Sequence, residues 1–316
     1  MRVSVQPPHE GPDHRPLTYD EIAANARLIE DVGFNGIWKG HHVPVPGDPQ
    51  RSMPDPLIHL MLAGMATERV ELGTCIYCVP LGNAAELAQR VYTMQAFVPG
   101  RFTFGVGTGS QAMEYEHAGL EWKKRFSRLD SHMAYIRSIY ETKPSEHVEK
   151  MFTREGAWSS AVEQPKFVGQ TAPMQLGMPR TILGAWLSEP QLRRAVAQYD
   201  GWMGSGGPGT HYGGWPVVVR DSIKRYRDMG GKRAMLTTVM VDLSAPEADL
   251  EPDGSFHLVC GPKSAAERLN MLQEFGYDDV ILSLVSAHGH GAAEDFTRER
   301  LEEIRSLVPL DDSDYH

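Results

Sequence analysis

The 316-residue sequence has few cysteines and no long apolar run. Its three thiols, Cys75, Cys78 and Cys260, are too few for a disulfide framework. No stretch approaches the ~20 consecutive apolar residues of a membrane span. A strand-like pattern follows Met1 at once, where a secretory signal would carry a basic and then an apolar segment. We therefore expect a cytoplasmic protein without a membrane partner.

Basic clusters are also missing. The formal net charge is −10 at pH 7, whereas a protein that binds nucleic-acid phosphates needs a basic patch. The nearest candidate, Lys123-Lys124-Arg125, is interpreted as the start of a solvated helix. We expect no nucleic-acid partner and a small molecule as the substrate.

The spacing of metal ligands is absent as well. Histidines are grouped at His41-His42 and at His288-Gly289-His290, but adjacent histidines cannot easily share one ion, and no Asp, Glu or Cys pattern accompanies them. Cys75 and Cys78 have the spacing of a redox pair, yet side chains three apart in a strand point to opposite faces. We predict no metal site and a structural role for these cysteines.

What the sequence does contain is a regular alternation of strand-like and helix-like segments. The strand-like segments are Arg2–Gln6, Phe34–Trp38, Val70–Val79, a run from Arg101 into alternate glycines, Arg180–Leu183, Gly201–Met203, Met235–Val241 and Val280–Leu284. The helix-like segments are Tyr19–Val32, Pro56–Thr67, Ala84–Phe97, Leu129–Tyr140, Pro190–Tyr199, Val217–Asp228, Ser264–Phe275 and Phe296–Leu307. Eight such units favour an α/β fold, a (β/α)8 TIM barrel forming a single domain over residues 1–316. The stretch Thr142–Met178 is interpreted as an insertion between strands 4 and 5, and a doubly wound sheet is the alternative.

The alternate glycines Gly105, Gly107 and Gly109 let bare backbone approach a ligand at the end of a strand. They do not match the dinucleotide fingerprint. Ser110 stands where its third glycine should be, and residues 111–116 show no apolar helix start.

In a barrel of this kind the active site forms at the carboxyl ends of the strands, so the residues just after each strand are the candidates. His41 and His42 follow the second strand, and His9 follows the first. Glycine-containing loops follow the fourth, fifth and sixth strands. A helix that begins near Glu189 would direct its amide groups toward a phosphate, although Ser188 also fits a plain N-cap.

Four phrases carry a resemblance to a known family: residues 26–38 ending in Gly33-Phe34-Asn35-Gly36-Ile37-Trp38, residues 66–74 ending in Leu72-Gly73-Thr74, residues 99–109 and residues 200–202. Together they resemble the bacterial luciferase-like monooxygenase family of flavin- or deazaflavin-dependent oxidoreductases. The resemblance implies a barrel that binds reduced FMN or, in one branch, the deazaflavin coenzyme F420. It also implies a cis peptide at Cys75-Ile76 beneath the ring, and a phosphate near the fifth and sixth loops.

The resemblance further implies roles for individual residues. His42 matches the catalytic histidine, with His41 beside it, but the acid that usually precedes this histidine is absent. The substrate pocket is expected at His9, Trp38 and Ser110. The expected cofactor-binding residues are Thr74, Cys75, Ile76, Gly107, Gly109, Gly184, Ala185, Ser188, Gly204 and Ser205.

The branch is decided by two short motifs. Pro80-Leu81-Gly82-Asn83 resembles the FMN branch, whereas Gly107-Thr108-Gly109 is common in the deazaflavin branch, where an acid often stands at the place of Ser110. We predict a flavoprotein monooxygenase that uses reduced FMN and O2, with a flavin reductase as a further partner and a homo-oligomeric state. A hydride-transferring F420-dependent oxidoreductase and a catalytically silent flavin-binding protein are the alternatives.

Overall fold

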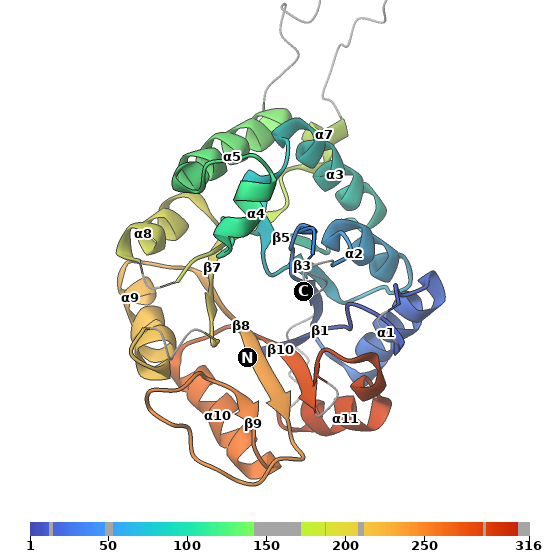
Figure 1. Ribbon diagram of the computed structural model, residues 1–316, viewed down its shortest axis with the longest axis vertical. Coiled ribbons are helices and arrows are strands. Elements are labelled where there is room, and N and C mark those ends of the chain that lie inside the picture. Colours follow the sequence, from blue (N-terminus) through green and yellow to red (C-terminus); the bar gives the residue numbers. More distant parts are fainter. Residues whose placement is uncertain are drawn as a thin grey trace, which may run out of the picture.

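The computed structural model describes residues 1–12, 15–47, 53–141, 172–186, 188–207, 212–286 and 289–308. Within them a closed barrel of parallel strands is surrounded by helices (Figure 1). Each barrel strand pairs with its neighbours in chain order, and the last strand pairs with both β1 and β8, which closes the barrel. The barrel strands are β1 (Arg2–Gln6), β2 (Gly36–Lys39), β3 (Glu71–Thr74), β5 (Phe102–Gly107), β6 (Arg180–Gly184), β7 (Gly201–Ser205), β8 (Arg233–Asp242) and β10 (Asp279–Ser286).

The outer ring of helices follows the predicted order. Its members are α1 (Tyr19–Val32), α2 (Pro56–Met65), α3 (Ala84–Phe97), α5 (Arg125–Glu141), α8 (Glu189–Gln198), α9 (Ser222–Asp228), α10 (Pro262–Phe275) and α11 (Arg298–Ser306). Shorter elements are β4 (Tyr77–Cys78), β9 (Leu258–Val259), β11 (Gly289–His290), α4 (Ala112–His117), α7 (Ala172–Leu176), the 3-10 turns Val79–Leu81, Trp122–Lys124 and Ala293–Asp295, and a π-helical turn at Pro216–Asp221. The predicted (β/α)8 fold is confirmed.

Two local predictions need comment. The predicted third strand, Val70–Val79, is interrupted: β3 ends at Thr74, and the Cys75-Ile76 peptide that follows is cis, as expected. The second difference is α4, a helix where the sequence indicated none. Only Glu114 and Tyr115 of its six residues are buried, which is too short a pattern to give a helical period. Most of the predicted insertion, residues 142–171, lies outside the described residues.

Two helix starts near the site are fixed by side-chain caps. Asp55 accepts hydrogen bonds from the amides of Leu57 and Ile58, and Pro56 begins α2. Asn83 caps α3 in the same way through the amides of Ala85 and Glu86. These caps hold Asp55 and Asn83 at the end of the barrel where the strands terminate.

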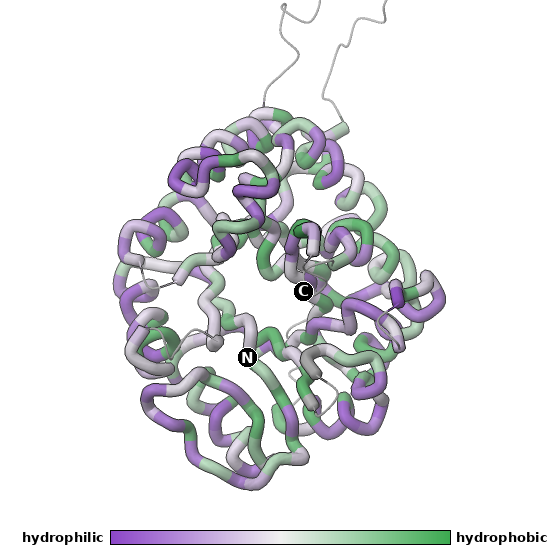
Figure 2. Tube along the Cα trace, in the orientation of Figure 1, coloured by the Kyte–Doolittle hydropathy of each residue, from purple (hydrophilic) through white to green (hydrophobic). Residues whose placement is uncertain are grey.

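The core has two layers, one between strands and helices and a smaller one inside the barrel. Trp38 fills the inner layer together with side chains from alternate positions of other strands. Gly73 makes room for it, since a Cβ there would lie 2.2 Å from the Trp38 ring. Hydrophobic colour runs along the inner strands, while the outward turns of the helices are largely hydrophilic (Figure 2).

Candidate active site

His42 and Glu114 form a close pair at the carboxyl ends of the strands. His42 Nδ1 lies 2.8 Å from Glu114 Oε1, and the Val43 amide donates to the same oxygen at 3.2 Å. The Glu114 side chain is fully buried, whereas that of His42 is 33% exposed. When Glu114 is ionised its carboxylate only accepts, so Nδ1 donates to it, and Nε2 of the neutral ring is then a proton acceptor. A carboxylate that orients an imidazole is the arrangement of a general acid or base.

Glu114 is the residue that sequence reasoning missed. The acid expected just before His42 is instead supplied by α4, from 72 residues along the chain. The sequence offers one indication of Glu114, an acidic residue shortly after the glycine run. That position alone does not predict a contact with His42. Glu114 Oε2 is buried and has no hydrogen-bond partner among the described residues.

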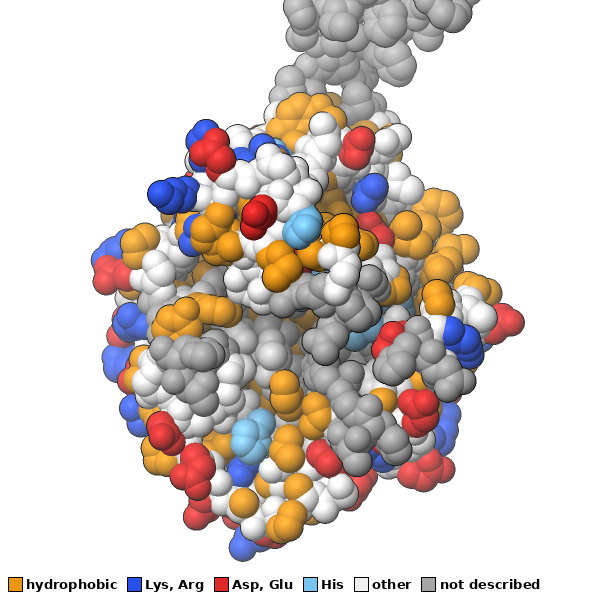
Figure 3. Space-filling view, in the orientation of Figure 1, with side chains coloured by type: hydrophobic (Ala, Val, Ile, Leu, Met, Phe, Trp, Pro, Cys, Tyr) orange, Lys and Arg blue, Asp and Glu red, His pale blue; other side chains and the backbone are white. Residues whose placement is uncertain are grey.

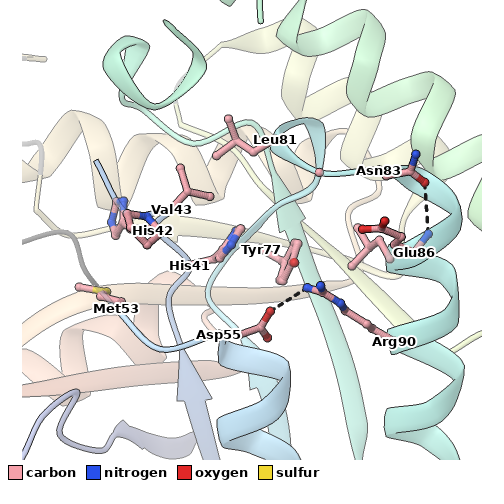
Figure 4. A pocket seen from close by; sticks show the side chains of 13 residues that line it. His41, His42, Val43, Met53, Asp55, Tyr77, Leu81, Asn83, Glu86 and Arg90 are labelled. Carbon is pink, nitrogen blue, oxygen red and sulfur yellow. Dashed lines mark hydrogen bonds and ion pairs between the residues drawn. The ribbon is translucent and has the colours of Figure 1, made fainter. Parts of the chain in front are cut away.

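His41 points in another direction, as expected for consecutive residues leaving a strand. Its ring stacks on Tyr77 with centroids 4.0 Å apart, and its Nδ1 accepts from the Cys78 amide at 3.2 Å. Burial lowers the pKa of His41 to about 4, so the ring is neutral at pH 7. Figure 4 shows its ring beside Tyr77, with His42 turned away from both.

The Ile76 side chain packs on the glycines at the strand ends. A Cβ on Gly184 would lie 2.3 Å from Ile76 Cγ2, and one on Gly107 would lie 2.6 Å from Ile76 Cδ1. Gly109 has a φ of +69° and packs against Cys78, since a Cβ there would lie 2.8 Å from Cys78 Sγ. The ends of β5 and β6 thus meet at the Ile76 side chain, which occupies the space that Cβ atoms on Gly107 and Gly184 would take.

The other expected cofactor residues lie at the same end of the barrel in varied settings. The hydroxyl of Thr74 donates to the Gly105 carbonyl at 2.6 Å, and Ser205 Oγ accepts from the Gly207 amide at 3.3 Å. Ser188 is the N-cap residue of α8 but makes no capping hydrogen bond, which differs from the plain N-cap role. The backbone of Ala185 pairs with Met203.

Gly204 completes this set beside β7. A Cβ on Gly204 would lie 2.8 Å from the Trp202 ring, so only a glycine fits there without a shift of that ring. Cofactor binding by any of these residues stays a prediction.

The three residues expected in the substrate pocket lie in different environments. Ser110 is exposed beside the glycine run, and His9 Nδ1 lies 2.8 Å from Lys39 Nζ. Lys39 also donates to the carbonyls of Pro7 and Pro8, and burial lowers its pKa to about 7. The Trp38 side chain is fully buried in the inner core layer, and a role in the substrate pocket stays a prediction.

A cavity of about 370 Å³ opens beside His41 (Figure 4). Its walls come from four segments: the residues after β2, the residues that lead into α2, Tyr77 of β4, and the turn and first helical turns of α3. The polar residues lining it are His41, His42, Asp55, Tyr77, Asn83, Glu86 and Arg90. In the space-filling view most charged side chains lie around the rim of the molecule, and hydrophobic ones are more frequent toward its middle (Figure 3).

The described residues contain no group of three or more His, Cys, Asp or Glu side chains placed to hold a metal ion. His288, half of one histidine grouping, lies outside them. None of their helices combines the length and the apolar character needed to cross a bilayer.

Comparison with known proteins adds a family and several similar structures. The family model described as luciferase-like monooxygenase matches residues 1–251. The F420-dependent glucose-6-phosphate dehydrogenase of Intrasporangium calvum is 32% identical over 126 residues, so the match spans only 38% of that relative and 38% of this chain.

Two solved structures share the fold at low identity. The oxygenating constituent of 3,6-diketocamphane monooxygenase from Pseudomonas putida, in complex with FMN, has a TM-score of 0.70 at 14% identity and covers 98% of this chain and 97% of that one. An F420-dependent secondary alcohol dehydrogenase has a TM-score of 0.66 at 14% identity and covers 98% of this chain and 99% of that one.

Proposed function

This chain belongs to the luciferase-like monooxygenase family, and from that premise we propose that it holds a deazaflavin over its strand ends while His42 handles the proton of the reaction. The protein is an oxidoreductase. The observation that carries the proposal is the 2.8 Å contact between His42 Nδ1 and Glu114 Oε1 beside the glycines at the strand ends.

The residues present fit a flat ring. Gly107 and Gly184 let the Ile76 side chain pack directly on the ends of β5 and β6, and a planar group would lie on the apolar surface that Ile76 forms there. Thr74, Cys75 and Ile76 would support one face of the ring. Gly184, Ala185 and Ser188 on one side, with Gly204 and Ser205 on the other, would hold its phosphate, because the Ser188 hydroxyl is not used to cap α8.

The cofactor, when bound, supplies the redox step: a deazaflavin exchanges a hydride with a substrate carbon, and reduced FMN passes electrons to O2. Oxidation of an alcohol removes a hydride from carbon and a proton from oxygen. His42 Nε2 accepts that proton, and the Glu114 carboxylate stabilises the resulting imidazolium. In the reverse direction the same nitrogen returns the proton to a carbonyl oxygen.

Two observations favour the deazaflavin. The His42–Glu114 pair suits a reaction in which one proton accompanies each hydride, and the relative from Intrasporangium calvum is F420-dependent by name. FMN is the second candidate because Pro80-Leu81-Gly82-Asn83 resembles the FMN branch. In that case O2 and a flavin reductase would be the further partners.

A titration separates these cofactors. We would add coenzyme F420, and separately reduced FMN under anaerobic conditions, to the cofactor-free protein and follow absorbance and fluorescence. We expect F420 to bind at least ~10-fold more tightly, a difference of about 1.4 kcal/mol. Tighter binding of FMN would reject the deazaflavin, and binding of neither would reject the cofactor site.

A matched pair of variants tests where the ring lies. Gly184→Ala places a methyl group 2.3 Å from Ile76 Cγ2 and should weaken cofactor binding. Gly82→Ala is the control, since a Cβ there meets nothing within 4 Å. Equal affinity of the two variants would contradict a ring above Ile76.

A further inference from the structure

We propose that the cavity beside His41 binds the non-reacting part of an uncharged, amphipathic alcohol or carbonyl compound and selects against sugar phosphates. This inference rests on the proposed function, because it names the substrate class of the same site. Its starting point is the cavity of about 370 Å³ that includes both His41 and His42 in its wall. A volume in this range suits a small organic ligand rather than a macromolecule.

The cavity adjoins the proton-handling pair. His41 and His42 are consecutive, so a ligand that contacts His41 has its other end within reach of His42. Figure 4 shows Tyr77 beside the His41 ring and Leu81 above it. The substrate would therefore lie with its reacting oxygen toward His42 and the rest of its body between α2 and α3.

The fixed hydrogen-bonding groups of this cavity are neutral. His41 Nδ1 already accepts from the Cys78 amide, so its Nε2 carries the ring hydrogen and acts as a donor. Burial raises the pKa of Tyr77 to about 12, which keeps its hydroxyl protonated at pH 7. Both groups bind a hydroxyl or carbonyl oxygen without needing a charge on the ligand.

The charges in the wall do not favour an anion. Arg90 is the single cation among the described lining residues, and Asp55 neutralises it at 2.9 Å. Glu86, from the first turn of α3, adds a negative charge that no lining cation balances, and the buried carboxylate of Glu114 lies behind His42. A phosphate ester would therefore meet net repulsion and would lose its hydration without gaining a paired cation.

The remaining lining is apolar. Val43, Pro44, Met53, Leu81 and Leu87 contribute carbon surface that a sugar phosphate cannot use. This composition separates the chain from its relative in Intrasporangium calvum, whose name specifies glucose 6-phosphate. The match to that relative covers 38% of its length, so it does not fix the substrate.

The test uses two probes of the same shape that differ in charge. Cyclohexanecarboxamide is neutral and cyclohexanecarboxylate is anionic; both are titrated calorimetrically into the cofactor-free protein, with glucose 6-phosphate as a third probe. We expect the amide to bind at least ~10-fold more tightly than the carboxylate, which is about 1.4 kcal/mol. Glucose 6-phosphate should neither bind nor displace the amide.

Three variants locate the effect. His41→Ala should weaken amide binding ~10-fold and leave cofactor affinity unchanged, because it removes the neutral donor. Glu86→Gln should reduce the ratio of amide affinity to carboxylate affinity by ~3-fold or more, because it removes the unbalanced negative charge. Gln89→Lys is the control: it makes the same change in net charge on an exposed position of α3 outside the cavity wall, and it should leave the ratio unchanged.

The outcomes are distinct from those of the cofactor titration. Carboxylate binding as tight as amide binding, binding of glucose 6-phosphate, or no amide binding up to its solubility limit would each overturn the inference. Amide binding that depends on His41 and Glu86 but not on Gln89 would support it. Failure of both cofactors to bind, with amide binding retained, would reject the proposed function and leave this cavity as a ligand site.

Discussion

The two ends of the barrel bury charge in opposite ways. At the amino ends of the strands, Glu71 and Asp279 are both bound by Arg233, whose four contacts to their oxygens measure 2.7 to 2.8 Å. Arg2 adds a contact to Glu71 at 2.7 Å, and Arg180 adds one at 3.5 Å. Every buried carboxylate in this network has a cation beside it.

At the carboxyl ends the buried polar groups are less evenly matched. Glu114 Oε2 and His59 Nδ1 have no hydrogen-bond partner among the described residues. Lys39 is held by two carbonyls and an imidazole rather than by a carboxylate. Burial lowers the pKa of both His41 and Lys39, so these groups are less easily charged than in water.

The difference separates stability from function. Buried groups that satisfy one another, as Glu71 and Arg233 do, have nothing left to offer a ligand. Buried groups with unused capacity cost folding free energy and remain able to bind or exchange a proton. The expected effects of mutation therefore differ in kind between the two ends.

The largest effect on the free energy of unfolding should come from a mutation at the amino end. Arg233→Met removes four contacts and leaves two buried carboxylates short of a cation, which should lower the free energy of unfolding by about 3 to 5 kcal/mol. Urea unfolding at pH 7 measures the loss. Turnover per folded molecule should stay near that of the wild type, because the network is at the opposite end from His42. A loss under about 1 kcal/mol would mean that the network is not a main source of stability.

The next largest effect should be on turnover, and it should come from a mutation at the carboxyl end. His42→Ala should reduce turnover by ~10²-fold or more, as expected for the loss of a general acid or base. The free energy of unfolding should fall by about 1 to 3 kcal/mol, less than for Arg233→Met, because the buried Glu114 carboxylate loses its imidazole partner. Steady-state kinetics and urea unfolding on the same preparation give both values.

His41→Ala is the matched control for this variant. It should mainly raise KM, since His41 faces the cavity and not Glu114. If His41→Ala loses turnover while His42→Ala keeps it, the two histidines have exchanged roles. If both keep full turnover, the histidine mechanism is wrong.

The comparison also explains what the sequence could predict. The barrel followed from the alternation of strands and helices, and the strand-end position of His42 followed from the barrel. Pairings between distant residues could not be predicted in this way: Glu71 and Arg233 are 162 residues apart, and their contact depends on closure of the barrel. Glu114 escaped prediction for a local reason, since a six-residue helix has too few turns to display a period.

A smaller effect should appear in the pH dependence of stability. Burial lowers the pKa of His41 from 6.5 to about 4. As the pH falls from 6.5 toward 4, His41 binds a proton in the unfolded chain but not in the folded protein, so the free energy of unfolding falls. With allowance for the partial exposure of the ring, we expect a loss of about 1 to 2 kcal/mol between pH 7 and pH 4.5.

Replacement of the ring tests the cause of this slope. His41→Gln does not titrate, so the part of the slope due to His41 should be absent from urea unfolding measured at the two pH values. Glu71, at the amino end, serves as an internal reference. Although burial alone would raise the pKa of Glu71, its contacts with Arg233 and Arg2 lower it to about 2, so its contribution is present above pH 4.5 and is lost only as the pH falls toward 2. Identical slopes in the variant and the wild type would exclude His41 as the titrating group.

The smallest effect on the free energy of unfolding should come from breaking a salt bridge on the outer surface of a helix. Lys224 and Asp228 lie one turn apart on α9, with Nζ and Oδ2 separated by 2.7 Å, the distance at which Arg233 binds Asp279. Their side chains are 74% and 61% exposed, whereas those of Arg233 and Asp279 are 16% and 1% exposed. Water and salt screen the exposed pair, so Lys224→Met should change the free energy of unfolding by under about 0.5 kcal/mol. Contact distance is the same in the two pairs, so urea unfolding of the two variants measures what burial and the additional contacts of Arg233 contribute beyond distance. A loss above about 1 kcal/mol for Lys224→Met would mean that burial is not what distinguishes the amino end of the barrel.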